Sequence, residues 1–128
     1  MLRSILAVIV GYATMAAGVI AVFAVAGQSP EQKITTEFMA VLTGVGFLFA
    51  GLGGYVTGWV AGQSPLKHGV ALAVVCGVLW AVSFAGVLAV AYAHVVWWFE
   101  AAKLVTGVGG ALLGSWLREI QIARRTAA

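Results

Sequence analysis

Four long apolar runs dominate the sequence and restrict the folds that it can adopt. They cover roughly residues 4–26, 36–61, 69–92 and 99–117. Each is close to or longer than the ~20 residues that an α-helix needs to cross a hydrocarbon core of about 30 Å. Helices satisfy every backbone group within lipid, whereas barrel strands would alternate apolar and polar residues. We therefore predict an all-α, single-domain membrane protein of four transmembrane helices, with a basic tail at 118–128.

The composition favours a membrane protein over a soluble one. Apolar residues make up 62% of the chain and charged residues 9%, whereas charged residues make up about 25% of a soluble domain. The Lys and Arg residues lie at the ends of the apolar runs, which is typical of membrane topology and not of a basic patch that binds nucleic acid. The lipid bilayer is thus the first predicted partner, and nucleic acid is not predicted to bind.

The basic residues also predict the orientation of the helices. If the runs cross in alternation, one side of the membrane receives more Lys and Arg than the other, and cytoplasmic loops carry this excess. Both termini are therefore predicted to be cytoplasmic. The side that carries the termini receives Arg3, Lys67, Arg118, Arg124 and Arg125. The other side receives Lys33 and Lys103. The tryptophans that are expected to anchor the helix ends at the membrane interfaces are Trp59, Trp97, Trp98 and Trp116.

Glycine and alanine recur at every fourth position of the second and third runs. Mid-helix glycines cost about 1 kcal/mol each in water, but in lipid they let two helix backbones approach closely, as in a glycine zipper. Gly54 and Gly58 are expected to face small residues of the third helix or of a partner chain, with the second and third helices forming a tight hairpin. The predicted packing residues are Gly46, Ala50, Gly54, Gly58, Gly62, Gly69, Ala73, Gly77, Ala81, Gly110 and Gly114.

A single straight neighbour cannot cover a whole stripe of this kind. Four residues advance an ideal helix by about 400°, so the row drifts by about 40° at each step. The outer members of the stripes, Gly46, Ala89 and Ala93, are therefore predicted to be free for another helix or another protein.

Two patterns recur along the chain. The glycine pattern G-x-G-G-x-x-x-G occupies residues 51–58 and 107–114, which suggests that two helical hairpins form a parallel 2+2 repeat. Because glycine makes up 17 of the 128 residues, chance recurrence is a rival explanation. The segment VAGQSP occurs at 25–30 and again at 60–65. We interpret it as the same helix stop used twice, because Gly just past a helix end with Pro soon after ends a helix.

Candidate reactive groups are sparse. No Asp, Glu, Lys, Arg or His lies in the middle of a predicted span, although such residues usually mark proton relays and ion paths. Glu100 and Lys103 lie at the outer boundary, three residues apart, and can pair across one helix turn. His68 and His94 lie about 39 Å apart along a continuous helix and cannot share a metal. We predict no catalytic residues, metal ligands or cofactor.

The stretch from Gly53 to Gly69 carries a sequence resemblance. Its order of Gly53-Gly54-Tyr55, then Ala61-Gly62, then Pro65-Leu-Lys-His68-Gly69 resembles a pattern in small uncharacterised bacterial four-helix membrane proteins. In these proteins a G-G-Y helix ends in A-G, and P-x-x-H-G or P-x-x-H-A follows. The resemblance covers 53–69 alone. It implies a four-helix fold and a bacterial cytoplasmic (inner) membrane location, and it implies no activity.

Three functional hypotheses follow, none of them enzymatic. The first is a protein that acts by helix association, as an accessory or assembly subunit of a membrane complex or as a homo-oligomer. The second is an oligomeric conduit for a small solute or ion, lined by Thr57, Ser83 and Thr106. The third is a subunit that binds a quinone, lipid or pigment, with Trp80 and Tyr55 against the gap left by the glycines.

Overall fold

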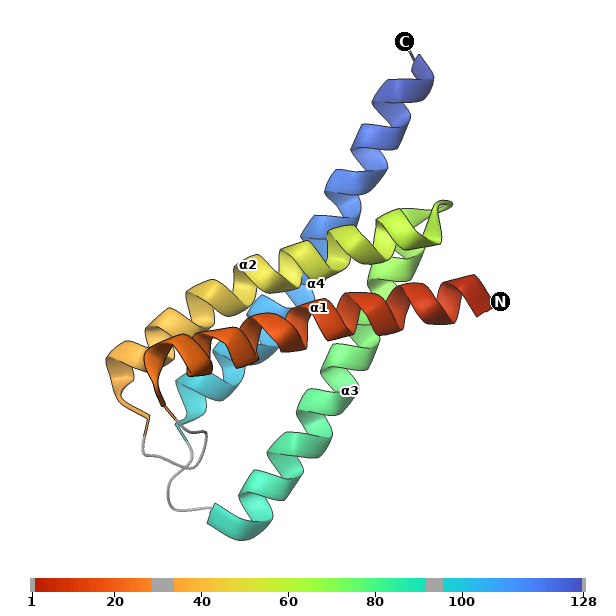
Figure 1. Cartoon of the computed structure of the whole chain (residues 1–128). Helices are drawn as coiled ribbons and strands as arrows, with labels where there is room; N and C mark the ends of the chain where they lie inside the picture. The colour runs from red at the N-terminus through yellow and green to blue at the C-terminus, as the bar shows by residue number, and fades with distance from the viewer. Residues whose placement is uncertain (1, 29–33, 92–95, 128) are drawn as a thin grey trace.

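The computed structural model describes residues 2–28, 34–91 and 96–127, and these residues form four helices without a strand. The helices are α1 (Leu2–Ala26), α2 (Thr36–Ala61), α3 (Pro65–Ala91) and α4 (Trp97–Ala127) (Figure 1). The all-α prediction is confirmed for this part of the chain. Three segments are long and apolar enough to cross a membrane, namely Leu2–Ala26, Thr36–Ala61 and Pro65–Gly86.

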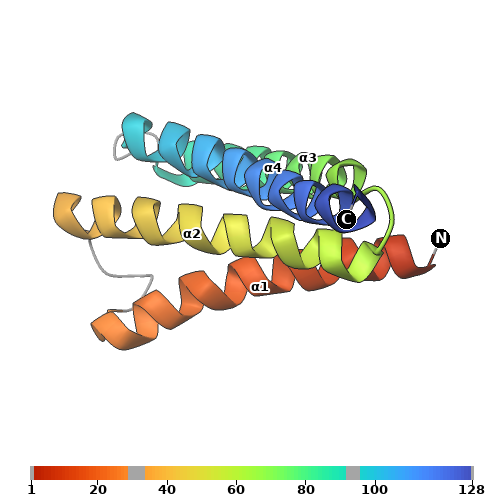
Figure 2. The ribbon, with the colours of Figure 1, turned by 90° about the horizontal axis from the view of Figure 1, so that it is seen from above.

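The helices form two layers. Seen from above, α1 and α2 lie in one layer and α3 and α4 in the other (Figure 2). The prediction of a tight α2–α3 hairpin is wrong, because α2 makes its most extensive contacts with α4 and far fewer with α3. The reason lies in the glycine pattern, because α2 and α4 each carry a copy of G-x-G-G-x-x-x-G and so offer each other a flat backbone surface.

Two glycines end helices in the way that the VAGQSP repeat predicts. Gly27 after α1 has φ +62° and Gly62 after α2 has φ +75°, a conformation that glycine adopts without a Cβ penalty. The Gln28 N–H donates to the Phe23 carbonyl (3.2 Å), which completes a Schellman motif. Gly62 instead donates from its own N–H to the Gly58 carbonyl (3.2 Å). The glycine has the same role in both copies, whereas residues 29 and 30 lie outside the described part of the chain.

Two helix bounds differ from the sequence prediction by four residues or more. Helix α3 begins at Pro65, not at 69, because proline fits the first helical position, where its missing N–H is not needed. Helix α4 continues to Ala127, not to 117, so the predicted basic tail is helical in the described residues. Its 31 residues span about 46 Å. Figure 1 shows the last part of α4 projecting beyond the other helices.

The bundle has two ends that we name by their contacts. At the turn end, the Arg3 Nε donates to the Val60 carbonyl (2.8 Å) and the Leu66 N–H donates to Glu119 Oε2 (3.0 Å). The start of α1, the α2–α3 turn and the late part of α4 therefore lie together. The opposite end, which carries Glu100, is called the open end.

The buried core is small and lies toward the turn end. Most of its members are alanines, and Leu72 is the largest side chain that is fully buried. Beyond Ala73, no α3 residue from 74 to 86 is buried. In Figure 1, α3 crosses α1 and then runs away from α1 and α2 toward its C-terminal end. Helix α3 therefore packs on α1 in the half of the bundle nearer the turn end, the closed half, and separates from α1 in the half nearer the open end, the open half (Figure 1).

Candidate functional site

The two copies of the glycine pattern pack directly against each other. A methyl group added to Gly54 would overlap the Ala111 backbone, and one added to Gly114 would overlap the Gly51 carbonyl. A Cβ at Gly110 would lie 2.5 Å from the Cβ of Ala50. These positions require glycine because the α2 and α4 backbones are in contact.

Other helix pairs in the closed half also have a glycine at their point of close contact. A Cβ on Gly11 of α1 would overlap the Thr57 hydroxyl of α2, and a Cβ on Gly69 of α3 would overlap Ser115 of α4. A Cβ on Gly58 would lie 2.8 Å from the Pro65 ring. Glycines thus hold α1, α3 and α4 close to their neighbours at and around the turn end.

A second set of helix glycines has open space where a Cβ would lie. Within the part of the chain that the structure describes, an added Cβ would meet no atom within 4 Å at six helix positions. All six lie at the middle of a helix or nearer the open end, where glycine brings no packing benefit to the monomer. They are Gly44, Gly46, Gly77, Gly86, Gly107 and Gly109.

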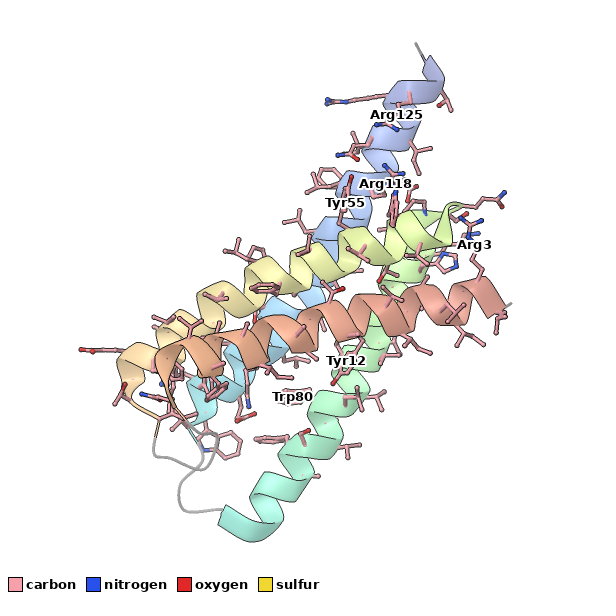
Figure 3. All side chains as sticks on the ribbon, viewed as in Figure 1. Arg3, Tyr12, Tyr55, Trp80, Arg118 and Arg125 are labelled. Carbon is pink, nitrogen blue, oxygen red and sulfur yellow. The ribbon has the colours of Figure 1, made fainter. Side chains whose placement is uncertain are left out.

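A cleft of about 490 Å³ occupies the open half, with walls from all four helices. Two of these six glycines, Gly46 of α2 and Gly107 of α4, line it. Figure 3 shows the Tyr12 and Trp80 side chains in the space between α1 and α3, and both line the cleft. Its walls are mostly apolar with a few polar groups, which is typical of binding sites in proteins.

The cleft has a charged and aromatic mouth at the open end. The Lys103 ammonium lies 2.7 Å from Glu100 Oε1 and 5.1 Å from the centre of the Phe99 ring, as an ion pair combined with a cation–π contact. The predicted pairing of Glu100 with Lys103 is confirmed. The Trp80 indole N–H donates to the Glu100 carbonyl (3.0 Å), and its ring stacks on Phe84 at 5.0 Å. Trp80 therefore ties α3 to α4 at this mouth.

The two threonine hydroxyls along the cleft donate to carbonyls of their own helices. Thr43 donates to the Met39 carbonyl (2.9 Å) and Thr106 to the Ala102 carbonyl (2.7 Å). Each hydroxyl oxygen keeps a lone pair as acceptor. Among the described residues, no group of three His, Cys, Asp or Glu side chains is placed to hold a metal ion. This arrangement offers apolar and polar binding contacts.

A polar network closes the turn end. The Tyr55 O–H donates to Gln121 Oε1 (2.8 Å), and Arg118 Nη1 donates to the same oxygen (3.3 Å). The Arg118 guanidinium also lies 5.8 Å from the centre of the Tyr55 ring. Figure 3 shows these two side chains next to each other between α2 and α4. The network fixes α4 to α2 beyond the last glycine contact.

The predicted packing residues divide between the two halves of the bundle. Gly62 is exposed and serves as the end of α2, with the Arg3 guanidinium against it. Gly46 and Gly77 have open space where a Cβ would lie, and Ala81 is exposed. The side chain of Ala89 and all of Ala93 lie outside the described residues, as do His94 and Lys33. The predicted packing residues that are buried are Ala50, Gly54, Gly58, Gly69, Ala73, Gly110 and Gly114.

The residues predicted to line a conduit do not share a path. Ser83 and Thr106 both line the cleft, whereas Thr57 is fully buried between α1 and α2 and donates to the Gly53 carbonyl (2.8 Å). Tyr55 and Trp80 are also separated, because Tyr55 belongs to the network at the turn end and Trp80 to the cleft.

The four tryptophans predicted as interface anchors are all exposed. Trp59 and Trp116 lie toward the turn end, and Trp97 and Trp98 begin α4 at the open end. This placement is the one that anchors at two membrane surfaces need, and the anchoring role itself stays a prediction.

Sequence reasoning did not place Tyr12, Met15 or Lys103 beside a common cleft. The sequence shows Tyr12 as a polar group within an apolar run, which is the one signal that pointed to it. No periodic pattern indicated that Lys103 and Met15 face a common space, because that space exists only through the divergence of α3 from α1.

Neither the protein-family models, nor the curated proteins, nor the solved structures compared with this chain match it.

Proposed function

We propose that this chain is a membrane subunit that acts by association, and that its open half receives a transmembrane helix of a partner or of a second copy. The carrying observation is the cleft lined by Gly46 and Gly107, neither of which has a neighbour for an added Cβ. Glycines in lipid favour close helix contact, and the monomer uses these two for no such contact. A partner helix in the cleft would contact the surface beside Gly46 and Gly107 that no other helix in the described part of this chain covers.

The proposed topology has four crossings with both termini in the cytoplasm. Helix α4 is less apolar than the other three, but its Gly110 and Gly114 contact Ala50 and Gly51 in the middle of the candidate span α2. A helix in contact there lies within the same apolar layer. The basic residues Arg3, Lys67 and Arg118 gather at the turn end, which supports a cytoplasmic location for that end.

The proposed location is a bacterial cytoplasmic membrane. The resemblance of residues 53–69 to small bacterial four-helix membrane proteins supports it. Detection of the protein in separated membrane fractions of a bacterial host, with peripheral proteins first removed by alkaline wash, tests insertion. Recovery of the chain in the wash would contradict it.

Paired glycine substitutions test the association. Gly107→Leu fills one wall of the cleft, whereas the matched control Gly44→Leu adds the same side chain to an exposed α2 position that does not line the cleft. The complex extracted in mild detergent is expected to lose its partner, or to fall to monomer, in Gly107→Leu alone. Native mass measurement checks this. A monomeric parent that copurifies with no other polypeptide would contradict the proposal, as would equal effects of the two substitutions.

A second candidate function is binding of a membrane amphiphile in the same cleft, and the mouth favours it. Lys103, Phe99 and Trp80 surround an apolar interior, which suits a molecule with a polar head and an apolar tail. Mass analysis of compounds extracted from purified protein tests it, with Trp80→Phe and Gly107→Leu expected to reduce occupancy. A cleft that holds no extractable compound in the parent would remove this candidate.

A further inference from the structure

A second cavity lies between α1 and α3 on the side of the turn end. This groove has a volume of about 600 Å³, and its lining is almost entirely apolar. Ser4 and His68 lie at one end of it, and Tyr12 and Ala13 at the other. The ten residues from Ser4 to Ala13 rise about 14 Å along α1. The groove is therefore long, narrow and apolar, with its polar end at the turn end of the bundle.

Basic residues flank the polar end of the groove, because Arg3 precedes Ser4 and Lys67 precedes His68. Lys67 is exposed and lies one helix turn before Ala71, a lining residue. The Arg3 guanidinium lies against Gly62 in the α2–α3 turn, where Figure 3 also shows it. His68 lines the groove itself, with Nδ1 3.1 Å from the Ser64 carbonyl oxygen. Three basic side chains, Arg3 from α1 and Lys67 and His68 from α3, thus lie near one opening.

One carboxylate lies near this opening, and it is already engaged. Glu119 accepts from the Leu66 N–H at the start of α3 (3.0 Å). Arg118, the residue before it, brings a further positive charge to the same end. With Arg3 and Lys67 opposed by Glu119, the charge near the opening is positive before His68 is considered. An anion is attracted here, while a neutral head group is not.

We infer that this groove binds an anionic phospholipid, with one acyl chain along α1 and α3 and the phosphate at Lys67, Arg3 and His68. The apolar lining matches an acyl chain, and the basic opening matches a phosphate group. Basic pockets between transmembrane helices on the cytoplasmic side hold such head groups. The site is separate from the cleft, because the two share Tyr12 alone among their lining residues, and the inference does not rest on the proposed association.

The test compares defined lipids on the delipidated full-length protein in mild detergent. Phosphatidylglycerol is expected to bind more tightly than phosphatidylcholine in a native mass titration. Lys67→Gln is expected to weaken phosphatidylglycerol binding about fivefold, because a basic residue at the membrane surface contributes on that scale. Arg125→Gln is the matched control, since Arg125 lies on the projecting end of α4 (Figure 3) and is expected to leave the affinity unchanged.

A second substitution tests the seat of the acyl chain. Ala71→Phe places a ring in the groove at an exposed position, and Ala21→Phe makes the same change on an exposed part of α1 that lines neither cavity. Only Ala71→Phe is expected to reduce phosphatidylglycerol binding. Equal affinity for the two lipids, equal effects of Lys67→Gln and Arg125→Gln, or no effect of Ala71→Phe would each overturn the inference. So would equal competition by free glycerol phosphate, which lacks an acyl chain.

Discussion

Gly54 of α2 lies so close to Ala111 of α4 that any side chain on Gly54 would overlap the Ala111 backbone. Gly54 is the fourth residue of the glycine pattern at 51–58, and Ala111 is the fifth residue of the pattern at 107–114. Their contact brings the α2 and α4 backbones together where the two glycine patterns meet.

Gly54→Ala is expected to destabilise the protein, because a methyl group at this position meets backbone and not a flexible side chain. Overpacking of this kind costs about 1–3 kcal/mol. Gly109→Ala is the matched control, since Gly109 has open space for a Cβ and alanine is the better helix former. Thermal unfolding in mild detergent should show a lower Tm for Gly54→Ala alone. A similar fall in both variants would refute the closed packing of α2 on α4.

The start of α3 is expected to depend on Glu119. The carboxylate accepts from the Leu66 N–H, one of the amide groups that a helix start leaves without an internal partner. Glu119→Ala should cost about 1 kcal/mol, as removal of a capping side chain does, whereas Glu119→Gln keeps an acceptor and should cost less. Hydrogen exchange at residues 66–68 is the measurement. If Arg124→Ala, an exposed substitution on the same helix, accelerates exchange equally, then the cap has no such role.

Trp80→Phe is expected to loosen the mouth of the cleft. The substitution removes the N–H that donates to the Glu100 carbonyl while keeping a ring that can stack on Phe84. The lost hydrogen bond is worth about 0.5–1.5 kcal/mol. Hydrogen exchange over residues 97–103 should accelerate, and Trp59→Phe, at an exposed position of α2, should leave it unchanged. Unaltered exchange in Trp80→Phe would show that this bond does not hold α3 to α4.

Helix α4 is expected to cross the membrane with its C-terminal end in the cytoplasm. In a Cys76→Ala background, an impermeant thiol reagent applied to intact cells should label Trp98→Cys and leave Arg125→Cys unlabelled. Both positions are exposed in the bundle, so burial does not protect either. Labelling of both sites, or of Arg125→Cys alone, would contradict the proposed topology.

The positions of the helices could be predicted from the sequence, because an apolar run within lipid must be helical to satisfy its backbone hydrogen bonds. The apolar runs predicted the four helices, and the glycines of the two VAGQSP segments predicted where α1 and α2 end. The partner of each helix could not be read in the same way. A stripe such as Gly54 and Gly58 shows that a close contact exists but not which helix makes it. The repeated G-x-G-G-x-x-x-G pattern indicates the partner of α2, because the copy in α2 packs against the copy in α4.

The cleft could not be predicted, because it depends on where α3 separates from α1. Ser83 and Thr106 were expected on a polar path with Thr57, but a shared residue type does not place side chains on a shared surface. Thr57 instead fills the space beside Gly11 and is fully buried. Lys103 was expected at a helix end, and its position over Phe99 at the mouth follows only from the packed structure.

The most direct test of the central claim, that the open half receives a partner helix, is site-specific photocrosslinking from Leu79 in the native membrane. Leu79 lines the cleft, whereas Ile20 is exposed on α1 outside it. We predict a polypeptide adduct from Leu79 and none from Ile20, with the adduct lost in Gly107→Leu and retained in Gly44→Leu. The absence of a polypeptide adduct at Leu79, or an adduct that Gly107→Leu leaves unchanged, would contradict the claim.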